Sequence, residues 1–284
     1  MSLKKNNILV IIYVVITVAP LLSGLIYAAL YSFGLIGNIG RAGFTLSYWK
    51  TLFAEKEILF SLWYSCYIAV TALFLSVSFA MLLTIFLKKD IEKGLFSYII
   101  YFPLAIPAIA SAFFIFQLLS KSGFISRIFF QLKLIKDIGD FPDLVNDHYS
   151  IAIIIAHILM ALPFFTLLFI NLYRSERIND LNILAKSMGA GKKQCLKMVT
   201  LPVLLTRSLP SLVLYFIFIF GSYEIPLVLG RQSPQMVSVL IIRKLQKFDL
   251  TTIPQGYIIA IIYAIFVFLI MALLLRYRRA NYAG

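Results

Sequence analysis

The sequence has 284 residues, of which 61% are hydrophobic and 13% are charged. A soluble domain carries about 25% charged residues, so the composition excludes an ordinary soluble protein and indicates that most of the surface faces lipid. The net charge of +14 does not indicate nucleic-acid binding, because the basic residues lie mainly in the connections between apolar runs, where membrane proteins place them.

Six apolar runs are each long enough to cross a bilayer, which takes about 20 residues of helix. Backbone groups in lipid must be paired within their own segment, so each run is predicted to be an α-helix. The first run is longer than the core of a signal peptide, and we expect a retained helix. The predicted spans are 8–31, 58–87, 95–119, 148–172, 207–229 and 256–275.

Dense positive charge lies directly at two helix ends, in the stretch Lys88–Lys93 and in the tail Arg276–Arg279. The positive-inside rule places such charge in the cytoplasm. Both termini and the basic connection 173–206 are therefore expected inside, with outer loops at 32–57, 120–147 and 230–255. The predicted fold class is an all-α, polytopic membrane protein with six transmembrane helices.

The connection 173–206 begins with a segment that can form a helix. Residues 178–188 contain few helix breakers, and Asn179 or Asp180 can cap the start. Gly189 suits a turn that needs a positive φ angle.

The two cysteines are far apart in the predicted topology, because Cys66 lies inside an apolar run and Cys195 in this basic connection. No disulfide or metal site is expected from them.

A second short helix is predicted over 191–199, with Leu196 and Val199 on one face. Leu201 and Pro202 are expected to end it, since proline cannot continue a helix interior. Two short helices around a Gly-Ala corner form a compact projection that can lie in a groove of a partner. The alternative is that this basic surface lies against anionic lipid headgroups.

This connection resembles the cytoplasmic EAA loop of the integral permease subunits of bacterial ABC importers. The family pattern is Glu-Ala-Ala, three residues, Gly, and later Leu-Pro. The matching positions here are Ala185, Gly189, Ala190, Leu201 and Pro202. Ile183 stands at the position of the family's Glu, and Leu184 at that of the first Ala. The contact that the family's Glu makes with the ATPase therefore cannot be transferred to this chain.

The resemblance covers about residues 58–275 and implies the fold of a type I ABC importer permease. It implies an N-terminal helix and external loop over 1–57, and a core of five transmembrane helices over 58–284 with the coupling loop at 173–206. Leu196 is included with the matching positions as a candidate coupling residue. The implied location is the bacterial cell (inner) membrane.

The resemblance also implies the partners. These are two ATP-binding subunits, a second permease subunit, an extracytoplasmic solute-binding protein and membrane lipid, with no nucleic acid. The chain itself is expected to be non-catalytic and to bind no cofactor, because ATP and Mg²⁺ are used by the partner ATPase. We expect the second permease to be a different chain, since the incomplete motif indicates an asymmetric pair.

Glu224 is the only acidic residue inside the predicted spans, and a charge in the bilayer is costly unless it is paired or faces water. Gly221 and Pro226 flank it and can break a helix, which frees backbone groups to line a cavity. The candidate residues of a translocation path are Gly221, Tyr223, Glu224, Pro226 and Asn171. The alternative is that Glu224 lies near the outer end and pairs with Arg231 or with water.

The stretch 220–230, with Pro234 and the Asp249-Leu250 pair, resembles permeases of the polyamine-type group. The same group includes importers of iron, thiamine and phosphonates, so the resemblance does not fix the solute. We expect a small polar or charged compound such as a polyamine. No phosphate-binding loop and no metal-ligand cluster is present in the sequence, so no catalytic or metal site is expected.

Two other classes of protein remain open. A self-contained secondary transporter or channel would predict inverted repeats and several intramembrane charges. A membrane-anchored scaffold or sensor would predict an additional soluble domain.

Overall fold

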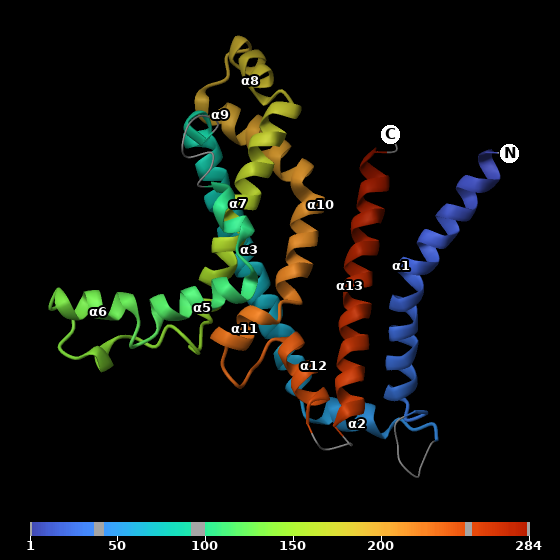
Figure 1. The fold of residues 1–284 in the computed structure, drawn as a ribbon. Helices are drawn as coiled ribbons and strands as arrows, with labels where there is room; N and C mark the ends of the chain where they lie inside the picture. The colour runs from blue at the N-terminus through green and yellow to red at the C-terminus, as the bar shows by residue number, and fades with distance from the viewer. Residues whose placement is uncertain (1, 37–42, 92–99, 248–251, 283–284) are drawn as a thin grey trace. The chain divides into compact units, whose positions relative to one another are not determined.

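The computed structural model describes residues 2–36, 43–91, 100–247 and 252–282, and every regular element among them is helical (Figure 1). The prediction of an all-α fold is confirmed. The chain groups into two compact units, one made of Met1–Ser61 with Val237–Ala272 and the other of Leu62–Met236 with Leu273–Gly284. The predicted domain boundary after residue 57 stays a prediction.

Six helical stretches of the described residues are long and apolar enough to cross a membrane, as predicted. Their number agrees with the sequence analysis, but the third and fifth differ in their bounds. The six stretches are Ile12–Ser32, Glu57–Lys88, Ala108–Gln131, Ile151–Ser175, Lys192–Phe220 and Ile253–Tyr277.

The third predicted span, 95–119, is not one continuous helix. Residues 95–99 lie outside the described residues, and the chain then forms one 3₁₀ turn, η1 (Phe102–Ala105), before α5 begins at Ala108. A residue before a proline is driven towards extended backbone, and Ile106, which precedes Pro107, has a ψ angle of 124°. The candidate span therefore runs through α5 (Ala108–Leu119) and α6 (Phe124–Gln131).

The fifth predicted span, 207–229, is also wrong as a single helix. Helix α10 (Leu201–Phe220) begins earlier and ends before Gly221, and a separate short helix, α11 (Glu224–Leu229), follows. Gly221 caps the end of α10, so the break expected there is present. Pro226 does not break a helix but lies in the first turn of α11, where the missing N–H has no partner to lose.

The first unit contains α1 (Ser2–Ser32), α2 (Ser47–Ala54), α12 (Val237–Leu245) and most of α13 (Ile253–Tyr282). Aromatic rings join α1 to α13, since the Tyr257 centroid lies 4.8 Å from that of Tyr31 and 5.7 Å from that of Tyr27. Such pairs add stability beyond the area that they bury.

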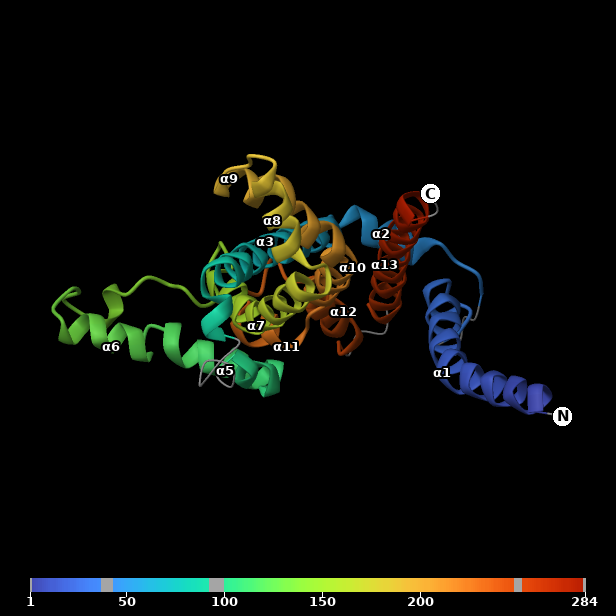
Figure 2. The ribbon, with the colours of Figure 1, turned by 90° about the horizontal axis from the view of Figure 1, so that it is seen from above.

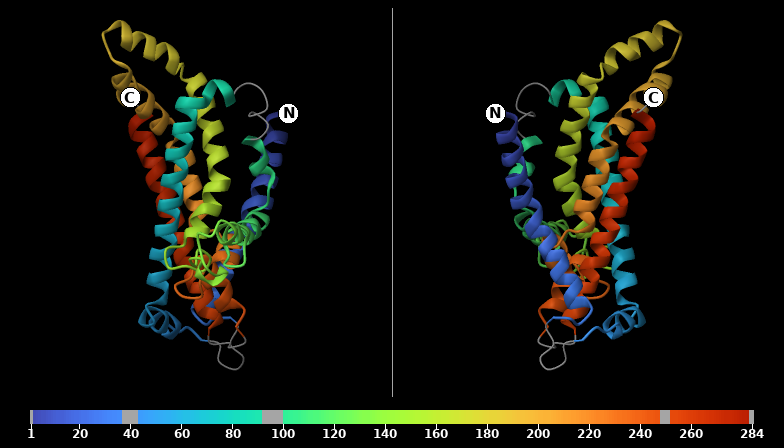
Figure 3. Two further views of the ribbon diagram at one scale, coloured as in Figure 1. Left: turned by 90° about the vertical axis from the view of Figure 1, so that its left-hand side faces the viewer. Right: turned by 90° about the vertical axis from the view of Figure 1, so that its right-hand side faces the viewer.

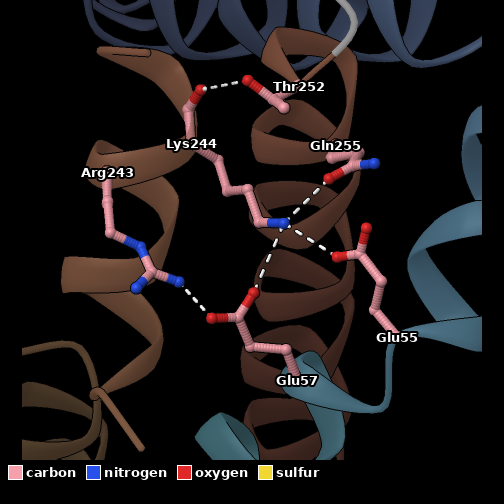
Figure 4. Close-up of polar contacts among 6 residues, drawn as sticks. All are labelled: Glu55, Glu57, Arg243, Lys244, Thr252 and Gln255. Carbon is pink, nitrogen blue, oxygen red and sulfur yellow. Dashed lines mark hydrogen bonds and ion pairs between the residues drawn. The ribbon is translucent and has the colours of Figure 1, made fainter. Parts of the chain in front are cut away.

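A cluster of charges around the buried Lys244 joins the corner between α2 and α3 to α12 and α13 (Figure 4). The Lys244 side chain is 5% exposed, and its Nζ lies 2.9 Å from Glu55 Oε2, 3.3 Å from Glu57 Oε2 and 2.9 Å from Gln255 Oε1. Arg243 pairs with the other carboxylate oxygen of Glu57. Two cations thus face two carboxylates, and the charge of the cluster is balanced.

The second unit contains most of α3 (Glu57–Ile91), the segments from η1 to α6, η2 (Ile138–Asp140), α7 (Ile151–Ser175), and the elements from α8 (Ile178–Ser187) to α11. Its apolar core takes buried side chains from α3, α7, α8 and α10, which are Ala80, Met81, Ala161, Phe165, Phe169, Ile178 and Leu204. Ile178 is fully buried there, so the start of α8 is packed into the core of the transmembrane helices.

Candidate functional site

Two short helices, α8 and α9 (Lys192–Cys195), project beyond the ends of α3 and α7, as Figures 1 and 3 show. Helix α8 agrees with the prediction for 178–188. The expected cap by Asn179 or Asp180 is wrong, because both lie inside the first turn of α8. The chain reverses instead at Arg177, which takes the left-handed conformation with φ of 48°.

The turn after α8 is built around Gly189, whose φ is +91° as the sequence analysis expects of a turn glycine. The Ala190 N–H donates to Ala185 O at 3.0 Å and closes the turn. Nothing lies within 4 Å of the position that a Cβ on Gly189 would take. The glycine is therefore required by the backbone angle and not by lack of space.

The prediction that Leu201 and Pro202 end the second short helix is wrong. Helix α9 continues through one π-helical turn, η3 (Leu196–Thr200), directly into α10. The Leu201 N–H donates to Leu196 O, a spacing of five residues. Pro202 then lies in the first turn of α10. In the first turn of a helix the backbone N–H groups need no partner within that helix. Proline, which has no N–H, is therefore tolerated at Pro202, and the π-helical turn lets the helix continue.

Asn182 joins α8 to η3 inside the projection. Its Nδ2 donates to Thr200 Oγ1 at 3.1 Å and to the Tyr173 hydroxyl at 3.4 Å. Thr200 and Cys195 are each only 4% exposed. Asn182 and Thr200 are not among the residues predicted from the sequence. A polar residue four positions after Ile178, hence on the same helix face, was the available signal for Asn182.

The tip of the projection exposes large apolar side chains. Leu184 is 61% exposed, Met188 is 83% exposed and Met198 is 73% exposed. Ile183, where the resembling family has Glu, is 65% exposed. An exposed apolar group rimmed by polar residues indicates a surface that another protein covers.

The candidate path residues lie at the break between α10 and α11. The Gly221 N–H donates to Ile217 O at 3.0 Å, and Tyr223 is the residue before α11. Glu224 is the exposed first residue of α11, and Pro226 is buried in the same turn. The structure thus brings four of the five predicted path residues to one break in the helix.

The fifth candidate, Asn171, is not part of this group. Gly230, which follows α11, lies beside Ile153 near the start of α7. Asn171 lies 20 residues after Ile151 on the same helix, which is about 30 Å away at about 1.5 Å per residue. Arg231 pairs with His148 and not with Glu224.

A pocket of about 340 Å³ lies between η1, α7 and α10. Aromatic rings form much of its lining, with the Phe164 and Tyr215 centroids 5.3 Å apart and those of Tyr215 and Phe218 5.5 Å apart. Met160 and Ser211, near the middles of α7 and α10, complete this wall. This pocket is not predictable from the sequence, because its residues come from three separate segments.

The fold of almost the whole chain is similar to that of a solved transporter structure. The chain matches a solved structure of a bacterial ABC transporter involved in the import of the acidic polysaccharide alginate, with a TM-score of 0.66 and 16% identity, over 96% of this chain and 95% of that one. At this identity the likeness shows the fold. No curated protein sequence matches the chain significantly.

The family model described as "Binding-protein-dependent transport system inner membrane component" matches residues 72–280. This range includes the projection, the break before α11 and the aromatic pocket. The chain therefore belongs to the family of binding-protein-dependent transport system inner membrane components, the membrane permease components of ABC importers.

Proposed function

We propose that this permease component couples solute passage to ATP hydrolysis by a separate ATPase, and that the projection 178–200 is the coupling element. The observation that carries the proposal is the apolar tip. Leu184 and Met188 are 61% and 83% exposed on a segment that also carries several lysines. Side chains of this kind are stabilised when a partner protein covers them.

The packing of the projection supports a mechanical role. Ile178 at the start of α8 is buried against α7 and α10 side chains, including Phe169 and Leu204. The hydrogen bonds of Asn182 join the other end of the projection to α8. Because packed cores do not deform continuously, a push on the tip shifts α7 and α10 as bodies.

The proposed assembly has two ATP-binding subunits, a second and different permease chain, and an extracytoplasmic binding protein that delivers the solute. ATP and Mg²⁺ belong to the ATPase subunits, and this chain binds no cofactor. Both termini and the projection lie on the cytoplasmic side of the bacterial inner membrane. The basic residues at the helix ends support this orientation.

The proposed solute path follows the aromatic pocket and the break before α11, and the proposed solute is a small cation of the polyamine type. Aromatic faces at Phe164, Tyr215 and Phe218 attract cations. The carboxylate of Glu224, exposed at the break, favours the same charge. An acidic oligosaccharide, like the alginate carried by the structurally similar transporter, would meet no cationic side chain in this pocket.

Purification from the native membrane in mild detergent tests the assembly. We expect an ATPase subunit and a second permease chain to purify with this chain, and ATP to be required for uptake in proteoliposomes. A chain that purifies alone and moves solute without ATP would identify a self-contained secondary transporter instead.

The solute is tested with the binding protein from the same assembly. We expect it to bind a polyamine and proteoliposome uptake of labelled polyamine to be slowed by Glu224→Gln. Binding of alginate oligosaccharides and not of polyamines would contradict this choice of solute while leaving the coupling role intact.

Gly189→Val tests the turn that shapes the projection. A β-branched residue at a φ of +91° is strained by roughly 1–3 kcal/mol, so we expect uptake and stimulated ATPase activity to fall about 10- to 100-fold. Insertion into the membrane should be normal, because a new Cβ meets nothing within 4 Å.

Gly191→Val is the matched control for this change. Gly191 has a φ of −73° and extended backbone that valine adopts readily. Its nearest new contact is Gln194 Oε1 at 3.8 Å. Near-normal uptake is expected for Gly191→Val, and an equal loss in both variants would argue against a special role for the Gly189 turn.

A further inference from the structure

A second pocket, of about 780 Å³, lies where the projection meets the ends of α3 and α7, and α8 and α9 form its other walls. It is distinct from the aromatic pocket and from the exposed apolar tip. Three lysines line it, namely Lys88 from α3, Lys186 from α8 and Lys192 from α9, and no carboxylate is among its lining residues. The polar side chains of Asn179, Asn182 and Thr200 complete the same wall.

The position of the pocket along the helices is that of the membrane–water boundary. Lys88 ends the candidate span Glu57–Lys88, and Tyr173 lies close to the end of Ile151–Ser175. The Lys88 Nζ lies 3.8 Å from the centre of the Tyr173 ring. Lysine and tyrosine at helix ends are typical of the headgroup level of a bilayer.

The lining changes character across this boundary. Ile85 and Phe86 line the pocket from within the span, and Phe86 is 74% exposed on a helix of lipid-facing composition. Two further lysines line it from the other side, namely Lys186, which lies outside the candidate spans, and Lys192, which is the first residue of the span Lys192–Phe220. An occupant that fits both parts is apolar at one end and anionic at the other.

Helix α8 presents the pocket and the apolar tip on different faces. At about 100° of rotation per residue, Asn179, Asn182 and Lys186 share one face, and all three line the pocket. Leu184 and Met188 fall on the opposite face. A ligand in the pocket therefore leaves the tip free for a partner protein.

We propose that this pocket binds a phosphate group and that its source is the headgroup of an anionic phospholipid. Lys186 and Lys192 supply the charge, Asn182 and Thr200 supply polar contacts, and Ile85 and Phe86 lie along the acyl chain. Basic pockets between transmembrane helices on the cytoplasmic side are suited to such headgroups. The bound lipid would fill the space between the projection and the ends of α3 and α7 and would stabilise the position of the projection at the membrane surface.

The test compares two double variants that remove the same charge from the same projection. Lys186→Gln/Lys192→Gln changes lysines that line the pocket, whereas Lys193→Gln/Lys197→Gln changes exposed lysines that do not. The transporter, purified with its partner chains, is titrated with phosphatidylglycerol, phosphatidylcholine or inorganic phosphate, and binding is followed by native mass spectrometry.

We expect the wild type and the control to bind phosphatidylglycerol equally well and more tightly than phosphatidylcholine. The pocket variant should bind phosphatidylglycerol about 30-fold more weakly, at roughly fivefold per lysine, and Lys186→Arg/Lys192→Arg should restore binding. The measured quantity is bound lipid and requires neither ATP nor transport, which separates this result from a failure of the coupling role.

The arms with the other probes distinguish the source of the phosphate. Loss of inorganic phosphate binding in the pocket variant, with unchanged phosphatidylglycerol binding, would retain the phosphate site and overturn the lipid as its source. Equal binding of every probe by the pocket variant and the control would overturn the site itself.

Discussion

The double variant Leu184→Glu/Met188→Glu is expected to insert and fold normally but to lose its ATPase partner and ATP-dependent uptake. Both side chains are largely exposed in the isolated chain, at 61% and 83%. A carboxylate in either place therefore disturbs no internal packing. The damage is expected only where a partner covers the tip.

The expected weakening of ATPase binding can be calculated from the apolar side chains that the ATPase no longer buries in the variant. Covering a leucine or methionine side chain contributes about 1.5–3 kcal/mol each. The two together correspond to at least a 100-fold weaker association, and the buried carboxylates add a desolvation penalty. The measurement is the amount of ATPase that purifies with the chain, together with uptake in proteoliposomes.

A matched control is Leu132→Glu/Leu134→Glu. These two leucines are each 64% exposed and lie in the segment between α6 and η2, which is far from α8 and α9 (Figure 1). The control should keep its ATPase. If the projection variant also retains a full complement of ATPase and uptake, the apolar tip is not the docking surface and the coupling element lies elsewhere.

The sequence predicts well those features that depend on local composition. The spans are recognisable because each needs a long apolar run, and 178–188 is recognisable as helical because it lacks breakers. Gly189 is predictable because few residues other than glycine accept a φ of +91°. Each of these features is decided by residues that are close together in the chain.

The breaks in the helices are less predictable, because apolar composition continues across them. Gly221 is recognisable as a possible break, but the apolar run from Phe220 to Leu229 does not reveal that a separate helix, α11, follows it. At Pro202 the sequence predicts a break where the structure has none. Proline usually ends a helix, but Pro202 lies in the first turn of α10, directly after a π-helical turn, where it is tolerated.

The sites themselves need the tertiary structure. Asn182 and Thr200 are 18 residues apart and meet only because the turn at Gly189 folds α9 back on α8. The aromatic pocket joins η1 to α7 and α10, and the basic pocket joins α3 to α9. The apolar tip is visible as such only when the exposure of Leu184 and Met188 is known.

The double variant Glu55→Gln/Glu57→Gln is expected to destabilise the protein strongly, by about 3–5 kcal/mol. The reason is Lys244, whose side chain is 5% exposed and whose ammonium lies 2.9 Å from Glu55 and 3.3 Å from Glu57. Without both carboxylates this ammonium keeps only neutral partners such as Gln255 Oε1. Thermal unfolding of the purified transporter measures the loss.

A third change separates the buried charge from general damage to the cluster. Adding Lys244→Met to the double variant removes the uncompensated ammonium and leaves an apolar side chain of similar length. Replacement of a whole buried ionic group by apolar residues is often neutral, so the triple variant should regain most of the lost stability. Arg243 is about one third exposed and can be solvated by water in both variants.

Lys247→Met provides the control, because Lys247 follows α12 closely but is exposed. It should leave the melting temperature unchanged, as most exposed substitutions do. A triple variant that melts no higher than Glu55→Gln/Glu57→Gln would show that the carboxylates stabilise this unit by contacts other than those with Lys244. Recovery would identify the charge balance around Lys244 as the interaction that fixes α12 to the corner between α2 and α3.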